Sequence, residues 1–519
     1  MRKRFKTLLC AAAIIGSVSV CAVFADTTID TETIISADDT VDNVSVVKPN
    51  GQLKIENSGG YIVNDNLTNE NIVNNAGELS VNGTLQNDGQ IENIGILNGN
   101  TLINSDTISG VTGSLNVKNG SNTGNITQGT INISGNPLNG LGFTNSGSIV
   151  SNVIKNNGVL INEKDATITI NNTMTNVGQI KNDGTVVTDA LNNAVGASII
   201  GDKGTLSFEQ GKNQGNISQA IINQTGNLTF TNEGQITAGK FNNSGTFTNV
   251  GADSKLTMSG GTNTGSISGG SIYIEGNYTN NGELEINNSD FSLADGKTID
   301  GTGNLTLNGG SNKGNILQTN LTLASGSFEN SGNIGNEQTP ISAIINKGTL
   351  NNSGNIIADT IQNDLQKQII NNSNIKANNS LDNKGTISGN GNLIIGGGSN
   401  SGEISQKDIT ISGNFINDKK ITSTGSFTNS ADITGGVDSE LNVANGTNSG
   451  NISQAIMNVS GNFTNSGVLD ITKDLTNTGS VINSNTISVA NELINNKNIT
   501  NKNSGTITVN KVLTNNAGA

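Results

Sequence analysis

The sequence predicts an all-β chain that folds as a parallel β-solenoid, a right-handed β-helix with about 20 residues per coil. Three observations predict it. A short motif recurs along the 519 residues, branched aliphatic residues alternate with polar ones in brief runs, and Gly or Asn bounds most of these runs. Alternation with a period of two is typical of half-buried strands. A fixed internal repeat favours a solenoid over a sandwich, because each unit can stack on the next.

The recurring motif is Gly-x-Asn-x-Gly, then a small polar or acidic residue, then Ile. Successive copies are separated by about 50 residues in three cases and by about 90 residues in two. We interpret the motif as a corner in which Gly supplies a positive φ, rather than as a ligand-binding turn. It lacks the Asp of a calcium-binding nonapeptide, and the two longer steps leave room for about two extra coils each. The copies begin at Gly120, Gly211, Gly261, Gly310, Gly398 and Gly446.

The residues that follow each copy predict a strand and then an interior ring. Aliphatic pairs such as Ile131/Ile133 have the spacing of one strand face. A Gly-Asn-aromatic sequence often comes next, so we expect Tyr278 to pack inside. Gln224 departs from the pattern, because it stands where the second aliphatic residue of one pair is expected. We also expect Asn residues at equivalent turns to form hydrogen-bonded ladders from coil to coil.

A finer repeat predicts the cross-section. Glycines recur every six residues at Gly77, Gly83, Gly89 and Gly95. Six residues fit one short face and one corner, so three such units would close a triangular coil of roughly 18–22 residues. At about 20 residues per coil the chain would form about 24 coils and a rod roughly 115 Å long.

The chain divides into three expected segments. Residues 1–25 have the basic start, apolar stretch and small-residue cleavage site of a secretory signal peptide. A lipoprotein signal through Cys21 is the weaker alternative, because Val20 stands where a small residue is required. We expect residues 26–50 to form a polar N-terminal cap, and residues 51–519 to form the repetitive solenoid.

Without residues 1–25 the chain is acidic and lacks several reactive side chains. The sequence has 27 basic and 41 acidic residues, and four basic but no acidic ones lie in that segment, which leaves a formal charge of −18. The remainder has no Arg, His, Cys or Trp. The usual acid–base, thiolate and phosphate-clamping groups are therefore missing. An acidic chain poor in aromatic residues is poorly suited to nucleic acid, and no later run reaches the ~18 apolar residues that span a bilayer.

A signal peptide followed by hundreds of residues of Asn-x-Gly-x-Ile/Leu coils without Cys resembles the passenger region of autotransporter-type adhesins of diderm bacteria. The resemblance covers almost the whole chain after residue 25. It implies an exported β-helical stalk presented at the cell surface or outer membrane, and low Cys content suits passage in an unfolded state. The given sequence lacks the C-terminal translocator barrel of that family and stops in mid-pattern, so we expect the solenoid to continue beyond it.

Three features could bind a ligand, and each has a simpler interpretation. The glycines around Gly389 and Gly398 could suggest a phosphate loop, but no nucleotide fingerprint or helix follows them. The acidic residues from Asp30 to Asp42 could hold Ca²⁺, although charge runs are usually solvated. Glycosylation sequons such as Asn125-Ile-Thr127 arise by chance in a chain rich in Asn and Thr.

Two further candidates concern carbohydrate. Tyr273 should point outward, where it could stack on a sugar ring. Glu283 and Glu285 could serve as the carboxylate pair of a glycosidase, and alternation puts both on the outer face. No Arg, His or aromatic cluster converges on them. We therefore predict that the chain is not an enzyme and has no catalytic, cofactor-binding or metal-binding residues.

Two functions fit this sequence. The leading hypothesis is an exported structural or adhesive solenoid that binds glycans or proteins of host or bacterial surfaces through an extended polar face. It would not bind nucleic acid or enter the membrane itself, and unpaired coil edges could allow self-association. The alternative is a β-helical hydrolase or lyase acting on polysaccharide. A third possibility, a disordered secreted tail, would show no β signal in circular dichroism.

Overall fold

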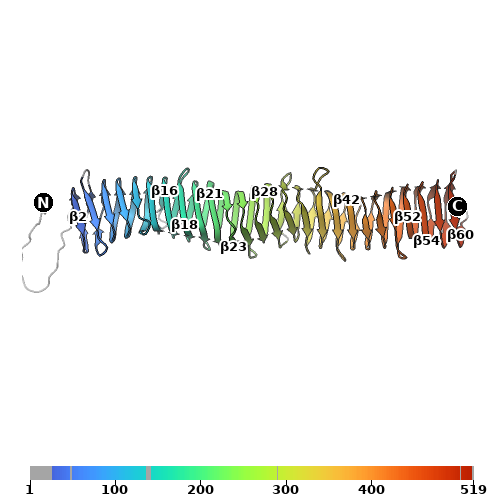
Figure 1. Ribbon diagram of the computed structural model, residues 1–519, viewed down its shortest axis with the longest axis horizontal. Helices are drawn as coiled ribbons and strands as arrows, with labels where there is room; N and C mark the ends of the chain where they lie inside the picture. Colours follow the sequence, from blue (N-terminus) through green and yellow to red (C-terminus); the bar gives the residue numbers. More distant parts are fainter. Residues whose placement is uncertain (1–25, 47–49, 136–141, 289, 503, 517–519) are drawn as a thin grey trace, which may run out of the picture.

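The computed structural model describes residues 26–46, 50–135, 142–288, 290–502 and 504–516. They form a rod of 60 strands, without helix, in which the chain progresses from one end to the other (Figure 1). The chain makes about 27 turns with roughly 18 residues per coil. The predicted class, an all-β parallel solenoid, is confirmed, whereas the right-handed sense stays a prediction.

Each coil has three faces, and the parallel strands of a face pair with those of the coils on either side. Equivalent residues of neighbouring coils stack in register, so that Thr28, for example, lies beside Ser45. An inward residue therefore stacks on inward residues along the whole rod. The first pairs are β1 (Thr27–Ile29) with β4 (Val44–Val46) on face I, β2 (Glu32–Ile35) with β5 (Gln52–Ile55) on face II, and β3 (Asp39–Val41) with β6 (Gly60–Val63) on face III.

The six-residue repeat of glycines marks one face and one corner, as predicted. Strand β9 (Glu78–Asn87) bends at Gly83, so its first part pairs with β6 on face III and its last part with β7 (Leu67–Asn69) on face I. Three such units make the observed coil of roughly 18 residues. This coil lies at the short end of the predicted range, because many corners hold only two residues. The rod therefore has more turns than the predicted number of coils.

The first coil comes from the segment predicted to be a polar cap. Residues 26–46 contribute three strands that pair with the second coil like any others. Asp30, Asp38 and Asp39 are exposed, and Asp42 is half-buried. The predicted signal peptide at residues 1–25 lies outside the described residues.

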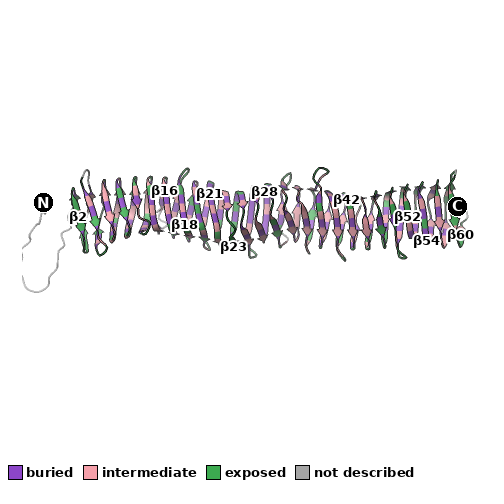
Figure 2. Ribbon diagram, in the orientation of Figure 1, coloured by how far each residue is buried: buried purple, intermediate pink, exposed green. Residues whose placement is uncertain are grey.

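The interior is one continuous hydrophobic column. Alternate residues of each strand point inward, and most of these are buried Ile, Leu, Val or Phe, with buried Asn the commonest of the others. Bands of buried and more exposed residues alternate across the strands over the length of the rod (Figure 2). A single coil could not shield these side chains from water, so stacking supplies the burial that stabilises each coil.

Ladders of Asn run inside this column, as predicted. The Asn is the last inward residue of a strand, not a turn residue, and its Nδ2 donates to the Oδ1 of the Asn one coil on at 2.6–2.8 Å. Because the Asn residues are almost fully buried, each amide needs this partner. The longest ladder on face I contains Asn69, Asn87, Asn104, Asn122, Asn145, Asn162 and Asn182.

The first Gly of each motif copy lies in a strand, in register with inward residues of the neighbouring coils, which corrects the predicted corner. In β13 (Ser114–Asn122), Gly120 stacks between Leu102 and Phe143. A Cβ on Gly120 would lie 1.8 Å from the carbonyl oxygen of Leu102. The preceding coil's backbone therefore leaves no space for a side chain here. In all six copies an aromatic residue lies beside this Gly, in register, in the next coil. The six rings are those of Phe143, Phe230, Tyr278, Phe328, Phe415 and Phe463.

The other parts of the motif also have structural roles. The predicted positive φ is confirmed for the first Gly of five copies. The second Gly, such as Gly124, does occupy a corner, where a Cβ would lie 2.0 Å from the carbonyl oxygen of Asp106. The motif Asn, such as Asn122, belongs to a ladder. Gln224, which departs from the expected aliphatic pattern, is also an inward residue, and its Nε2 donates to the carbonyl oxygens of Leu228 and Thr246 at 3.1 and 2.9 Å.

The uneven steps between copies follow from the three faces. A shorter step, of about 49 residues, is about two and two-thirds turns. Because it falls one face short of three full turns, each copy lies on the face that precedes the face of the copy before it, as face II precedes face III. The two longer steps, of about 90 residues, are about two turns longer, in agreement with the two extra coils predicted. The copies at Gly120 and Gly310 lie on face I, those at Gly211 and Gly398 on face III, and those at Gly261 and Gly446 on face II.

Candidate functional site

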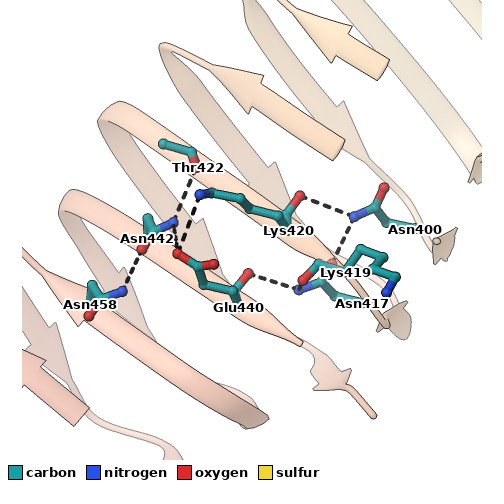
Figure 3. A network of polar contacts seen from close by, with 8 residues as sticks. All are labelled: Asn400, Asn417, Lys419, Lys420, Thr422, Glu440, Asn442 and Asn458. Atoms are coloured by element: carbon teal, nitrogen blue, oxygen red, sulfur yellow. Dashed lines mark hydrogen bonds and ion pairs between the residues drawn. The ribbon is translucent and has the colours of Figure 1, made fainter. Parts of the chain in front are cut away.

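The outer faces carry rows of polar side chains in register from coil to coil. Figure 3 shows one such row on face I, where Asn442 donates to Thr422 at 3.3 Å and Asn458 donates to Asn442 at 2.8 Å. Beside it the Lys420 ammonium lies 3.5 Å from the Glu440 carboxylate, and both groups are partly exposed. An exposed ion pair of this kind adds little stability. The Glu440 carboxylate also accepts a hydrogen bond from Asn442 at 2.7 Å.

The same view shows hydrogen bonds from buried Asn side chains to the backbone at the corner next to this row. Asn400 and Asn417 donate to the backbone oxygens of Lys420 and Glu440, each at 3.2 Å (Figure 3). These bonds tie the last inward residue of face III to the first residue of face I. The backbone beneath the outer rows is therefore held on both sides of the corner, so a ligand on the face would meet a preorganised surface.

A row of four Thr on face II illustrates the surface that such a ligand would meet. The Thr side chains stack in register over four successive coils and form no hydrogen bond with another described residue. Each hydroxyl can both donate and accept, and neighbouring coils are about 4.8 Å apart. The row consists of Thr410, Thr428, Thr447 and Thr464.

The two Tyr candidates differ as predicted. Tyr273, in β28 (Ser271–Asn280), points outward and is half-buried. The Lys255 Nζ lies 4.2 Å from its ring centroid, so a cation already covers one face of the ring. Tyr278 is only 1% exposed and packs in the core, where burial raises its pKa. Of these two Tyr, Tyr273 alone could contact a sugar.

The carboxylate pair lies on another face from Tyr273. Glu283 and Glu285, in β29 (Glu283–Ile286), are both exposed on face III, as predicted. The Asn304 amide donates to Glu283 at 2.7 Å, and Ser268 lies beside Glu285 in the preceding coil. The structure does not bring the carboxylates and Tyr273 together, and a flat face supplies no wall to position a substrate.

The remaining candidates stay apart from one another. Among the described residues, no group of three or more acidic side chains could hold a metal ion, the Asp30–Asp42 segment included. Gly389 lies where the next residue of a ladder would stand, with a φ of 124°. Asn125, the sequon residue, is exposed at the start of β14 (Asn125–Ile133).

The structure also shows a Gln that sequence reasoning missed. Gln219 accepts a hydrogen bond at 2.7 Å from Asn182, although a coil with Gly201 lies between them. The longer side chain crosses the coil that lacks an Asn and ends the ladder. The signal was present in the sequence, because Gln stands eight residues after the first Gly in five of the six copies. These residues are Gln128, Gln219, Gln318, Gln406 and Gln454.

A recess of about 440 Å³ lies near the N-terminal end, at the corner between faces II and III. Its lining includes the aliphatic Ala76 and Ile94 and the acidic Glu56 and Glu92. A second recess of about 200 Å³ lies on face III near Asn98. Neither recess includes Tyr273, Glu283 or Glu285.

Comparison of the chain with protein-family models, curated proteins and solved structures found no match. The described part of the chain contains no helix with the length and hydropathy needed to cross a bilayer.

Proposed function

We propose that this chain is an exported, surface-associated rod that adheres to glycans or proteins of host or neighbouring-cell surfaces through its outer faces. The observation that carries the proposal is the continuity of those faces, where stacked hydroxyl, amide and charged side chains cover parallel strands over about 27 turns. The sequence adds a segment at residues 1–25 with signal-peptide features.

The chemistry of the faces favours many weak contacts over one enclosed site. A single row such as that of Thr410 offers one or two hydrogen bonds per coil, each with a net contribution of about 1 kcal/mol. Contacts repeated along a rigid rod add without a new ordering cost for each coil, which gives avidity. A ligand with a repeating structure, such as a polysaccharide or an array of glycans, would use this geometry best.

Adhesion by cells tests the proposal. We expect cells that lack the gene to adhere to a glycan-bearing surface several-fold less than wild type, and re-expression of the full chain to restore adhesion. Normal adhesion and aggregation by the deletion strain would contradict the proposal. Release of reducing sugars by the purified chain, lost on substituting Glu283→Gln and Glu285→Gln, would favour the polysaccharide-acting alternative.

A further inference from the structure

The groove between faces II and III arises from an uneven series of corners. Four residues, from Glu56 to Gly59, connect β5 to β6, and the Gly59 amide donates to the Glu56 carbonyl at 2.8 Å. The next two coils turn the same corner with only two residues each, Ala76-Gly77 and Ile94-Gly95. The coil after them again uses four residues, 110–113. Two short corners between two longer ones leave a depression across the coils.

The floor and rim of this depression expose aliphatic side chains. Ile94 is 50% exposed. Val111, which lies at the same corner one coil later, is 67% exposed. Ile96, the first outward residue beyond the corner, is 43% exposed. Aliphatic side chains gathered at a concave site mark a contact surface better than the same residues scattered singly.

Acidic residues surround these aliphatic side chains. Glu56 and Glu92 line the groove, and Glu78 lies beside Ile96 in register. The Lys54 ammonium is 3.7 Å from Glu56, so the one basic group among the described residues that line the groove is already close to a carboxylate. Residues 26–112 hold 13 of the 41 acidic residues but only two lysines, whereas the rest of the chain after residue 112 has 28 acidic residues and 21 lysines. The groove therefore lies in the most negative part of the rod.

We propose that this groove docks an extended cationic peptide segment of a partner protein, in which aliphatic residues alternate with Lys or Arg. The aliphatic side chains would enter over Ala76 and Ile94, and the basic ones would meet Glu56 and Glu92. Charge complementarity selects this partner. An acidic segment would be repelled by the negative field at this end of the rod, and a neutral segment would gain no electrostatic steering from it. This inference does not depend on adhesion to cells.

Direct binding to the purified full chain tests the proposal. The probe is a seven-residue peptide of alternating Lys and Leu. We expect one peptide per chain, an affinity that falls with added salt, and at least about tenfold weaker binding of a Lys/Ser peptide and of a Glu/Leu peptide. Equal binding of the Lys/Ser peptide would overturn the proposal, because it would show attraction without use of the aliphatic floor.

Matched variants locate the site. Ile94→Ser and Glu92→Lys should each weaken binding about tenfold. Val195→Ser and Glu285→Lys alter exposed residues far from the groove and should change binding less than about twofold. Equal effects from the two pairs would overturn the proposal. A chain dimer in sedimentation that Ile94→Ser abolishes would also overturn it, by assigning the groove to a second copy. All four residues are exposed, so folding should survive, and circular dichroism checks this.

Discussion

Gly120 shows how closely the backbones of neighbouring coils approach each other. A Cβ there would collide with the Leu102 carbonyl of the preceding coil, and Phe143 lies beside it in register in the next coil. The same pairing of Gly with an aromatic residue recurs in all six motif copies, with Tyr278 as the one ring that carries a hydroxyl. The repeated motif therefore serves packing between coils, and substitutions in it should change the stability of the rod.

Substitution of this Gly should be costly. In Gly120→Ala the Cβ would meet the Leu102 carbonyl at 1.8 Å in a backbone with a φ of 127°. We expect local destabilisation of about 2–5 kcal/mol. In Gly196→Ala the φ is 77° but nothing lies within 4 Å, so we expect only about 1 kcal/mol. Hydrogen exchange of the surrounding strand amides measures both, and equal losses would contradict the packing argument.

The bridging Gln should not tolerate shortening. In Gln219→Asn the side chain loses one methylene and cannot cross the coil of Gly201 to reach Asn182. The buried Asn182 amide still donates to the Thr205 carbonyl at 3.1 Å, but its second N–H then lacks a partner, which costs about 1–3 kcal/mol. Gln362→Asn, in an outward residue that donates to Asp364 at 2.6 Å, should cost less than about 0.5 kcal/mol. Comparable hydrogen-exchange losses in the two variants would show that the bridge is not needed.

Among the elements, the four-residue corners hold the two non-glycine residues with positive φ in the described part of the chain. Asp165 and Gln366 have φ values of 68° and 62°, whereas equivalent turns have Gly196 and Gly296 there, at 77° and 66°. The turn at Gln366 is closed by a hydrogen bond of 3.0 Å from the Lys367 amide to the Asp364 carbonyl. The left-handed conformation is easier for Gly than for a residue with a Cβ.

Replacement of Gln366 by Gly should therefore stabilise the rod. We expect Gln366→Gly to add up to about 1 kcal/mol to the local free energy of opening, reduced by the greater freedom of Gly in the unfolded chain. The same change at Gln362, inside β40 (Asn355–Asn363), should instead cost about 0.5–1 kcal/mol. Urea titration with a probe near this coil measures both. If Gln366→Gly instead lowered the stability, the Gln366 side chain would contribute more free energy to the folded state than its left-handed backbone conformation costs.

The elements also show how far sequence reasoning reaches. Alternation such as Ile131/Ile133 predicts inward and outward residues, and the glycines around Gly83 predict three faces, because both patterns are local. The Gln219 bridge could not be understood this way, since its partner Asn182 is 37 residues away and lies beyond an intervening coil. The groove at Ile94 was missed for a related reason. It depends on the relative lengths of four stacked corners, which no single segment contains.

At the scale of the whole molecule, stability is distributed along the rod. Apart from the Gln bridges, which reach two coils, each coil mainly contacts its neighbours, so opening at one position need not unfold the rest. The chain after residue 25 has no Cys, and stacked aliphatic residues with Asn ladders take the place of disulfides. The charge is uneven, since the acidic residues are least balanced by lysine in residues 26–112. Shape and charge together present long polar faces and one strongly acidic end.

Small-angle scattering tests the central claim, the extended solenoid, most directly. About 27 turns at about 4.8 Å each give a rod roughly 130 Å long. For the folded chain we expect a maximum dimension of about 130 Å and, as for any thin rod of that length, a radius of gyration of about 38 Å. A radius of gyration of about 23 Å, the value for a compact globular chain of similar size, would contradict the account.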